Sequence, residues 1–272
     1  MVINKIIIIS IIALMFLLPY YWMVVISFEP EALVTDVNPH LIPQNFTFDN
    51  YRYLFFKVQY FYRWIFNSLF ISITAAVLVC TSAAMAGYVL ARRKFPGSRA
   101  FFLVFLGSMA IPGNILFLPR FMLMKSLGLM NTYPSMFILA MSGAGGVFLM
   151  KQIIQVIPNE MIEAAMIDGA DEWNIFYHIV LPMIKPGIIA LGIFTFVSTY
   201  NDYFWQLLMV KDAAMKTLPL AVANFISKGE TWEPRIQLIM AAASLASLPL
   251  LILFFLFHKN FLKGITIGGV KG

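Results

Sequence analysis

Long uncharged runs constrain this chain more than any other feature of its sequence. The first run extends from Ile6 to Phe28, follows Lys5, and holds no charged residue over 23 positions. A bilayer core of about 30 Å needs about 20 helical residues, and a helix satisfies its own backbone hydrogen bonds there. The run is long for the core of a signal peptide, and bulky aromatics rather than a small-residue cleavage site lie at its end. It therefore predicts a retained membrane-spanning helix.

Five further apolar segments follow the first. Only 12% of the residues are charged and 61% are hydrophobic, against about 25% and about 45–50% in soluble domains. This balance excludes a soluble globular domain and a disordered chain, and predicts an all-α integral membrane protein. The predicted spans cover residues 6–28, 64–91, 100–119, 136–150, 186–210 and 236–257. The fourth is the shortest and glycine-rich, and the sequence Ile111-Pro112-Gly113-Asn114 should kink the third.

The positive residues orient these spans. The link between the second and third spans is short and holds Arg92, Arg93, Lys94 and Arg99. Short, densely basic links stay in the cytoplasm, so both termini are predicted to be cytoplasmic. Residues 29–63 then form an extracytoplasmic cap with a short helix near its end, and residues 259–272 form a cytoplasmic tail.

The long cytoplasmic link from Lys151 to Lys185 is unusually acidic. It holds five of the 13 acidic residues of the chain, namely Glu160, Glu163, Asp168, Asp171 and Glu172. Amphipathic helices that rest on lipid usually carry basic residues instead. The acidic link therefore favours contact with a partner protein.

A helix–glycine–helix elbow is predicted within this link, over residues 158–182. Pro158 and Asn159 can begin its first helix, with Met161, Ile162, Ala165 and Met166 on one face. Gly169 fits a left-handed cap at the end of that helix. Asp171 can cap a second helix, which Pro182 and Pro186 would close. Its apolar side would consist of Trp173, Phe176, Tyr177 and Val180.

The sequence EAAMIDGA followed by IVLP, at residues 163–182, resembles the signature loop of inner-membrane permeases of binding-protein-dependent ABC importers. Other segments are similar to the carbohydrate-uptake branch of that family. They are LGLMNTYPS (127–135), Asn201-Asp202 with Trp205, TLPLA (217–221), and the C-terminal FLKGITIGGVKG (261–272), which is similar to the maltose-type second permease. The resemblance covers nearly the whole chain.

The resemblance implies the six-helix type I ABC importer permease fold, in an inner membrane of a bacterial or archaeal cell. The elbow would act as a coupling helix in a cleft of a cytoplasmic ATPase. The residues at the motif positions are Glu163, Ala164, Ala165, Asp168, Gly169 and Ala170. The implied partners are a second permease, two ATPase subunits that bind ATP and Mg, and an extracytoplasmic sugar-binding protein. A homodimer stays open beside the heterodimer.

Candidate residues for a sugar path lie near the end of the fifth span. A carboxylate and an amide can bind hydroxyl groups, and an aromatic ring can stack on a sugar. These residues are Asn201, Asp202, Tyr203 and Trp205. The alternatives are that the aromatics anchor the span at the interface, and that Asp202 pairs with Lys211 or Arg235. The glycines and lysines of the tail from Gly264 fit a flexible segment as well as one that reaches the ATPase.

Catalytic chemistry is not indicated by any motif. No glycine-rich run with a following Lys and Ser or Thr is present, so ATP hydrolysis is expected on the partner and no cofactor on this chain. The three histidines, at positions 40, 178 and 258, are far apart in sequence and have no metal-ligand spacing, so no metal site is predicted. A proton-coupled secondary carrier is the alternative function, but it needs titratable groups within the spans, and Asp202 and His258 make a poor relay.

Overall fold

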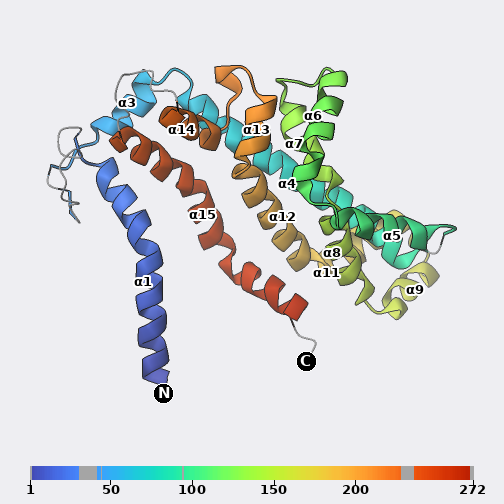
Figure 1. Ribbon diagram of the computed structural model, residues 1–272. Coiled ribbons are helices and arrows are strands. Elements are labelled where there is room, and N and C mark those ends of the chain that lie inside the picture. The colour runs from blue at the N-terminus through green and yellow to red at the C-terminus, as the bar shows by residue number, and fades with distance from the viewer. Residues whose placement is uncertain (1, 31–41, 44, 94, 228–235, 270–272) are drawn as a thin grey trace. The chain divides into compact units, whose positions relative to one another are not determined.

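A computed structural model of the chain describes residues 2–30, 42–43, 45–93, 95–227 and 236–269. All regular structure in these residues is helical, which confirms the predicted all-α class (Figure 1). The chain divides into two compact units. The first comprises Met1–Asn67 and Lys216–Ile252, and the second comprises Ser68–Met215 and Leu253–Gly272.

The first unit holds helices and parts of helices, of which all but α1 contribute residues to a small core. They are α1 (Val2–Ser27), α3 (Asp49–Lys57), the beginning of α4 (Phe61–Arg92), α14 (Leu218–Ser227) and the beginning of α15 (Ile236–Gly269). The buried core residues are Leu54, Phe61, Trp64, Leu218, Ala221, Ala241 and Ala242. The α3 helix confirms the short helix predicted in the segment 29–63, of which residues 31–41 and 44 lie outside the described part.

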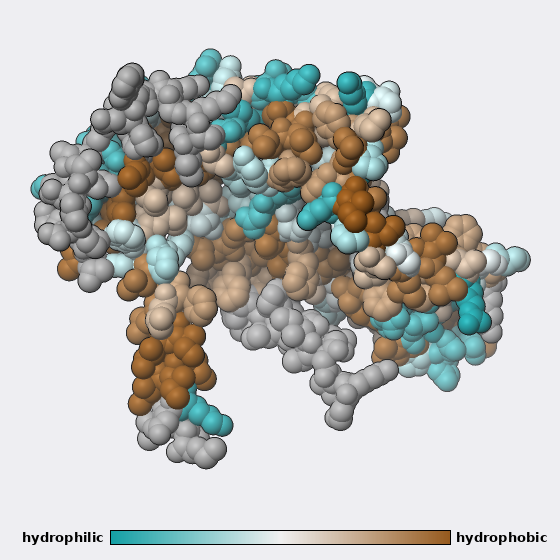
Figure 2. Space-filling model, in the orientation of Figure 1, coloured by the Kyte–Doolittle hydropathy of each residue, from teal (hydrophilic) through white to brown (hydrophobic). Residues whose placement is uncertain are grey.

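The first helix exposes its apolar side chains almost completely. The most apolar 18-residue window of α1 is 0% buried, and the side chain of Phe16 is 81% exposed. Figure 2 shows this surface as a hydrophobic column. The C-terminal end of α1 is fixed by polar contacts, since Asn50 Nδ2 donates to the carbonyl oxygens of Ser27 and Glu29 at 2.9 and 2.8 Å. A helix that is apolar on every side and unburied requires an apolar surrounding, which a bilayer supplies.

The second unit contains the rest of the chain. Its helices are the remainder of α4, α5 (Ser98–Met109), η1 (Gly113–Leu116), α6 (Phe117–Ser126), α7 (Tyr133–Phe137), η2 (Ile138–Ser142), α8 (Ala144–Gln155), α9 (Asn159–Ile167), α10 (Glu172–Asn174), η3 (Ile175–Val180), α11 (Leu181–Met183), α12 (Lys185–Tyr200), α13 (Tyr203–Met209), η4 (Ala213–Met215) and the end of α15 from Leu253. The larger core joins α4, α8, α9, η3 and α12. Its members include Val79, Ala83, Tyr88, Val147, Met150, Ile154, Ile162, Phe176, Val180, Ile184 and Leu191.

Three described helices are long and apolar enough to cross a membrane alone. They cover Lys5–Ser27, Phe61–Arg92 and Ile236–Phe257. Three bent helix pairs would raise the number to six if each pair is one span. One pair, Ser98–Met109 with Gly113–Ser126, bends by 97°, which confirms the kink predicted at Pro112.

Two helices differ from the sequence expectation. The segment 186–210 was expected to be one helix, but α12 ends at Tyr200 and α13 begins at Tyr203. The break forms because Asp202 caps α13, with its Oδ1 accepting a hydrogen bond from the Trp205 amide at 3.1 Å. The predicted tail from residue 259 is helical up to Gly269, since α15 continues through it and glycine costs a helix only about 1 kcal/mol. Residues 270–272 of the tail lie outside the described part.

Candidate functional site

The elbow begins with the short helix α9, and a glycine, Gly169, lies just after the end of that helix. Gly169 has φ of +82°, so the predicted left-handed cap is confirmed. The Gly169 amide donates to the carbonyl of Met166 at 3.1 Å, and the Ala170 amide donates to that of Ala165 at 2.9 Å. This pair of bonds is a Schellman motif, which satisfies the last carbonyls of the helix. A turn of this kind fixes the direction in which the chain leaves α9.

Asp171 begins the second helical part of the elbow, as predicted. Its Oδ1 accepts a hydrogen bond from the Asn174 amide at 2.7 Å, across α10. The chain then continues through η3 and α11 into α12. The left-handed residue and this cap are only two positions apart, so the turn between the two helices is specified locally from both sides.

Only part of the predicted apolar face of α9 packs against the core. Ile162 is 5% exposed and Ala165 packs against the same core, but Met161 and Met166 are exposed. Of the four residues predicted on one face of the helix, only Ile162 and Ala165 therefore pack against the core. A helix of nine residues contacts the core along a single stripe, and the two methionines lie at its edges.

The outward face of α9 combines charge with apolar surface. Its exposed residues are Glu160, Glu163, Ala164 and Ile167, and Ile167 is 86% exposed. Asp168 and Gly169 are exposed beside this face, whereas Ala170 packs partly against the core. Of the six motif residues, four are accessible and the two others, Ala165 and Ala170, hold the elbow to the core.

The second helical part also departs from the prediction. Phe176 and Val180 are buried, but Trp173 and Tyr177 are exposed and stack on each other with ring centroids 6.0 Å apart. Pro182 and Pro186 lie in the first turns of α11 and α12, so they begin the following helices and do not close the preceding one. A proline is accepted in a first turn because the amide it lacks would have no intrahelical partner there.

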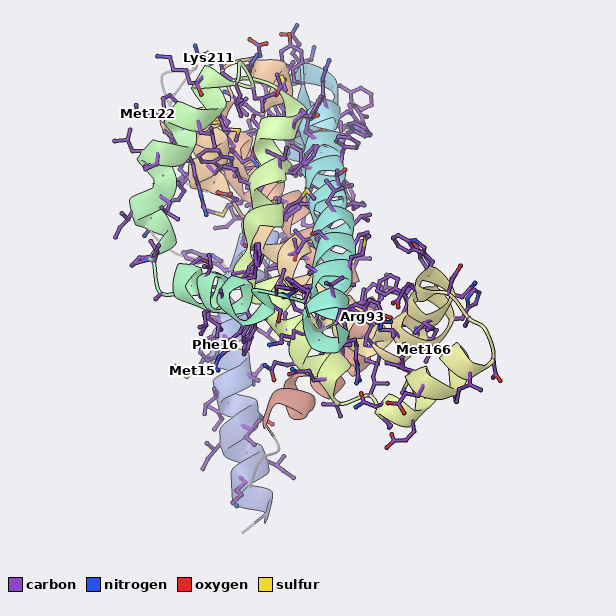
Figure 3. The ribbon with its side chains drawn as sticks, turned by 90° about the vertical axis from the view of Figure 1, so that its right-hand side faces the viewer. Met15, Phe16, Arg93, Met122, Met166 and Lys211 are labelled. Atoms are coloured by element: carbon purple, nitrogen blue, oxygen red, sulfur yellow. The ribbon has the colours of Figure 1, made fainter. Side chains whose placement is uncertain are left out.

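The C-terminal end of α4 contacts the elbow on both sides of α9, which the sequence did not reveal. The Arg92 guanidinium donates to the carbonyl oxygens of Ile154 and Ile157 and to Asn159 Oδ1. Arg93 forms an ion pair with Glu172. Figure 3 shows Arg93 at the end of α4, on the side where the elbow lies. The basic link at residues 92–99 and the acidic link at residues 151–185 therefore contact each other in the fold.

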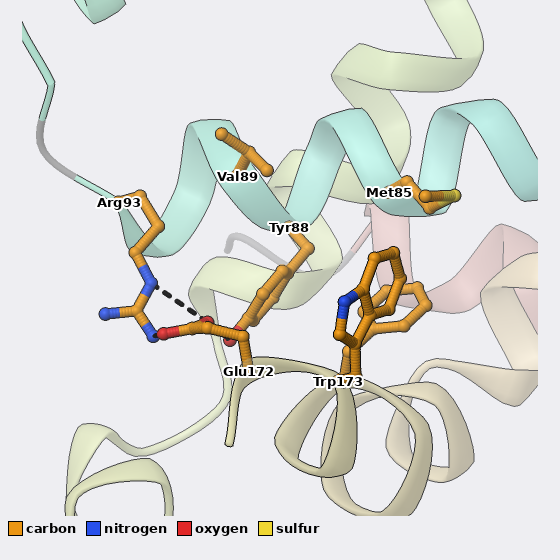
Figure 4. Close-up of a pocket in the computed structure, with 7 residues that line it drawn as sticks. Met85, Tyr88, Val89, Arg93, Glu172 and Trp173 are labelled. Carbon is orange, nitrogen blue, oxygen red and sulfur yellow. Dashed lines mark hydrogen bonds and ion pairs between the residues drawn. The ribbon is translucent and has the colours of Figure 1, made fainter. Parts of the chain in front are cut away.

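A groove of about 400 Å³ opens beside this ion pair (Figure 4). It is lined by Met85, Tyr88, Val89, Arg93, Glu172, Trp173 and Phe176. Tyr88 donates its hydroxyl to Glu172 Oε2 at 2.8 Å, and Arg93 Nε donates to the same oxygen at 3.2 Å. Burial alone lowers the pKa of Arg93, but its bonds to Glu172 and Tyr88 raise that pKa overall. The guanidinium therefore stays charged and paired with the carboxylate.

The four candidate path residues lie around the break between α12 and α13. Asn201 and Tyr203 are exposed, and Asp202 is half-buried as the cap of α13. Trp205 is 5% exposed, and its Nε1 donates to the Ser135 carbonyl at 2.8 Å. No ion pair joins Asp202 to Lys211 within the described residues, and Arg235 lies outside them.

The motif segment 127–135 is bound to residues 209–212, which follow the motif at Asn201, Asp202 and Trp205. Asn131 has a left-handed φ of 57°, and its Oδ1 accepts hydrogen bonds from the amides of Lys211 and Asp212, each at 3.0 Å. Its Nδ2 donates to Asp212 Oδ2 at 2.7 Å, and its own amide donates to the Met209 carbonyl at 2.9 Å. One asparagine therefore ties the two segments together.

Replacing Asn131 by alanine is expected to destabilise this junction by about 1–2 kcal/mol. Alanine lacks the three side-chain hydrogen bonds and is strained at a left-handed φ. Thermal unfolding of the purified protein measures the effect. Asn131→Gly removes the bonds but relieves the strain, so it should cost less than Asn131→Ala. Equal stability of both variants and the unchanged protein would contradict the assigned role.

Metal-binding and catalytic clusters were not expected, and the described residues contain no group of three or more His, Cys, Asp or Glu side chains placed to hold a metal ion. His178 lies in η3 with Nδ1 3.2 Å from the carbonyl oxygen of Asn174. His40 and the side chain of His258 lie outside the described part.

The elbow, with its accessible motif residues, lies within the region that a known family shares. The pattern of the binding-protein-dependent transport system inner membrane component family matches residues 83–267. The chain belongs to this family. The permease is thus a multi-pass inner-membrane component of an importer that works with a binding protein, and its relatives are transport proteins rather than enzymes.

Individual relatives agree with that assignment. The arabinooligosaccharides transport system permease protein AraQ of Halalkalibacterium halodurans is 34% identical over 264 residues, which cover 96% of this permease and 93% of the relative. The maltodextrin transport system permease protein MdxG of Bacillus subtilis is 32% identical over 232 residues, which cover 84% of this permease and 82% of the relative. The predicted resemblance to carbohydrate-uptake permeases is therefore confirmed.

A solved structure supports the fold. A chain from the crystal structure of a bacterial ABC transporter involved in the import of the acidic polysaccharide alginate superposes with a TM-score of 0.84. The match covers 95% of each chain at 21% identity. The helical arrangement is thus that of an ABC importer permease.

Proposed function

We propose that this permease forms, with a second permease, the membrane path for a sugar or oligosaccharide in an ATP-driven importer. An extracytoplasmic binding protein delivers the sugar, and two cytoplasmic ATPase subunits bind ATP and Mg. The permease crosses the membrane six times, with α1, α4, α15 and the three bent helix pairs as its spans and both termini in the cytoplasm.

The observation that carries the proposal is the exposed outward face of α9. It presents Glu163, Ala164 and Ile167 outside the packed core, on a helix whose ends are fixed by a Schellman turn and by the contacts of Arg92. The small Ala164 between larger residues allows another backbone to approach closely. Burial of the exposed Ile167 side chain against a partner would contribute favourable free energy to binding. This face suits insertion into a cleft of the ATPase, through which closure of the ATPase dimer would move the spans.

Carbohydrate is the proposed cargo because the relatives are named as permeases for arabinooligosaccharides and maltodextrin. Asn201, Asp202 and Tyr203 are the proposed contacts of the sugar. Trp205 supports them indirectly, because its ring is buried and its Nε1 is bonded to Ser135. The family membership favours this importer over a proton-coupled carrier.

Purification of the tagged permease from its native membrane tests the proposal. An ATPase and a second permease should copurify, and the ATPase rate in liposomes should rise when sugar-loaded binding protein is added. A permease that purifies alone, and that accumulates sugar in vesicles under a proton gradient without ATP, would refute the importer.

A further inference from the structure

Two adjacent arginines at the C-terminal end of α4, its last residue Arg92 and the following Arg93, bind different parts of the chain around α9. Arg92 binds the chain that enters α9: the carbonyl oxygens of Ile154 and Ile157, and Asn159 Oδ1. Arg93 binds Glu172 in the chain that leaves α9. The two flanks of one short helix are thus held by neighbouring residues at the end of another helix.

The contacts of Arg92 have a clear physical reason. The last carbonyl groups of a helix have no intrahelical partner and carry the negative end of the helix dipole. Ile154 lies in the last turn of α8, and Ile157 is between α8 and α9. A planar guanidinium with several donors can bind both carbonyls and the Asn159 amide oxygen at once.

The contacts of Arg93 also involve Tyr88, a side chain of α4. Glu172 Oε2 accepts from Tyr88 and from Arg93, which are five positions apart near the C-terminal end of the helix. Glu172 directly follows Asp171, the residue that caps α10. Movement of α10 is therefore resisted at the carboxylate by two donors, one on α4 and one directly after it.

We propose that Arg92, Arg93 and Glu172 are positioning residues that transmit the movement of α9 to α4. The inference rests on the proposed function of the elbow as the contact with the ATPase. The apolar contacts of Ile162 and Ala165 with the core hold α9 in place but allow sliding, because dispersion contacts have no fixed direction. The hydrogen bonds are directional, and they fix the chain to the end of α4 on both sides of α9, at Asn159 and at Glu172 of α10.

A purely structural role predicts a different result from a role in transmission. Arg93 and Glu172 have side-chain exposures of 36% and 54%, and exposed ion pairs contribute little to stability. Loss of this pair should therefore leave the folded complex intact. If the pair transmits movement, its loss changes how much sugar is transported per ATP hydrolysed.

The test compares variants of the permease in the assembled complex, reconstituted in liposomes with its binding protein. Arg93→Gln and Glu172→Gln should each lower the sugar transported per ATP hydrolysed by at least threefold, at an unchanged melting temperature. Arg93→Lys and the double exchange Arg93→Glu with Glu172→Arg should restore most of it. Arg99→Gln is the matched control, because Arg99 is an exposed basic residue of the same link without an ion pair in the described part of the chain.

Amide hydrogen exchange in the same samples reports the contacts themselves. The amides of α9 and α10 should exchange at least threefold faster in Arg93→Gln and at the wild-type rate in Arg99→Gln. Unchanged exchange and unchanged transport per ATP in both Gln variants would overturn the inference alone. A wild-type complex whose ATPase does not respond to loaded binding protein would overturn the proposed function, and the inference with it.

Discussion

Gly169→Val is expected to uncouple ATP hydrolysis from sugar uptake. Apart from the neighbouring residues in the chain, no atom lies within 4 Å of the Cβ that a substitution would add, so this Cβ meets no clash. The cost comes from the backbone, because φ is +82° and a β-branched residue in that region is strained by about 1–3 kcal/mol. The Schellman turn should open, which releases the end of α9 from the core contact at Ala165.

The measurement is the ATPase rate of the purified complex with and without loaded binding protein. A penalty of one or two kcal/mol changes an equilibrium by about 5–30-fold. The stimulation of the ATPase by loaded binding protein should therefore decrease by about this factor. Insertion into the membrane should persist, since Gly169 is exposed in a link between apolar segments. Sugar uptake by vesicles should fall together with the stimulation.

Gly169→Asn is the control for this prediction. Asparagine tolerates the left-handed conformation far better than valine does, and it is also larger than glycine. If strain is the cause, the Asn variant should keep most of the stimulation, with Gly169→Ala between the two. Equal loss in the Val and Asn variants would show that the size of the side chain matters, and unchanged stimulation in Gly169→Val would exclude the role of the turn.

Local signals in the sequence predicted the two caps at the turn after α9. Gly169 and Asp171 could be identified because a left-handed cap and an N-cap depend on the residue itself and its nearest neighbours. The kink at Pro112 is local in the same way. The break at Asp202 had an equally local signal, an aspartate before an apolar run, but the apolar composition of the segment suggested one continuous span.

Long-range pairings could not be predicted from one sequence. Arg93 and Glu172 are 79 positions apart, and the Trp205 indole and the Ser135 carbonyl are 70 apart. Each residue has many chemically suitable partners, and only the fold selects one. The acidic and basic links were both visible as charge clusters, but their contact depends on how α4 and the elbow pack. The narrow inward face of α9 has the same origin, since its neighbours decide which residues are covered.

Gly87→Ala is expected to destabilise the second unit by about 1–3 kcal/mol, the usual cost of overpacking a core. A Cβ at Gly87 would lie 2.8 Å from Met150 Cβ and 2.9 Å from the Lys151 backbone nitrogen. Backbone atoms cannot move aside as a flexible side chain can, so α4 and α8 would have to separate. Small residues allow such close helix contacts in membrane proteins.

Separation of α4 from α8 would also affect the elbow, because α8 leads directly into α9 and the C-terminal end of α8 is bound by Arg92 of α4. Gly107→Ala is the matched control: Gly107 lies in the apolar helix α5, and nothing lies within 4 Å of the added Cβ. That change should be neutral or stabilise by up to about 1 kcal/mol, since alanine is the better helix former. Thermal unfolding of the purified protein should separate the two variants, with about 2–4 °C for each kcal/mol. Equal melting temperatures would mean that α4 and α8 do not approach each other as closely at Gly87 as this geometry requires.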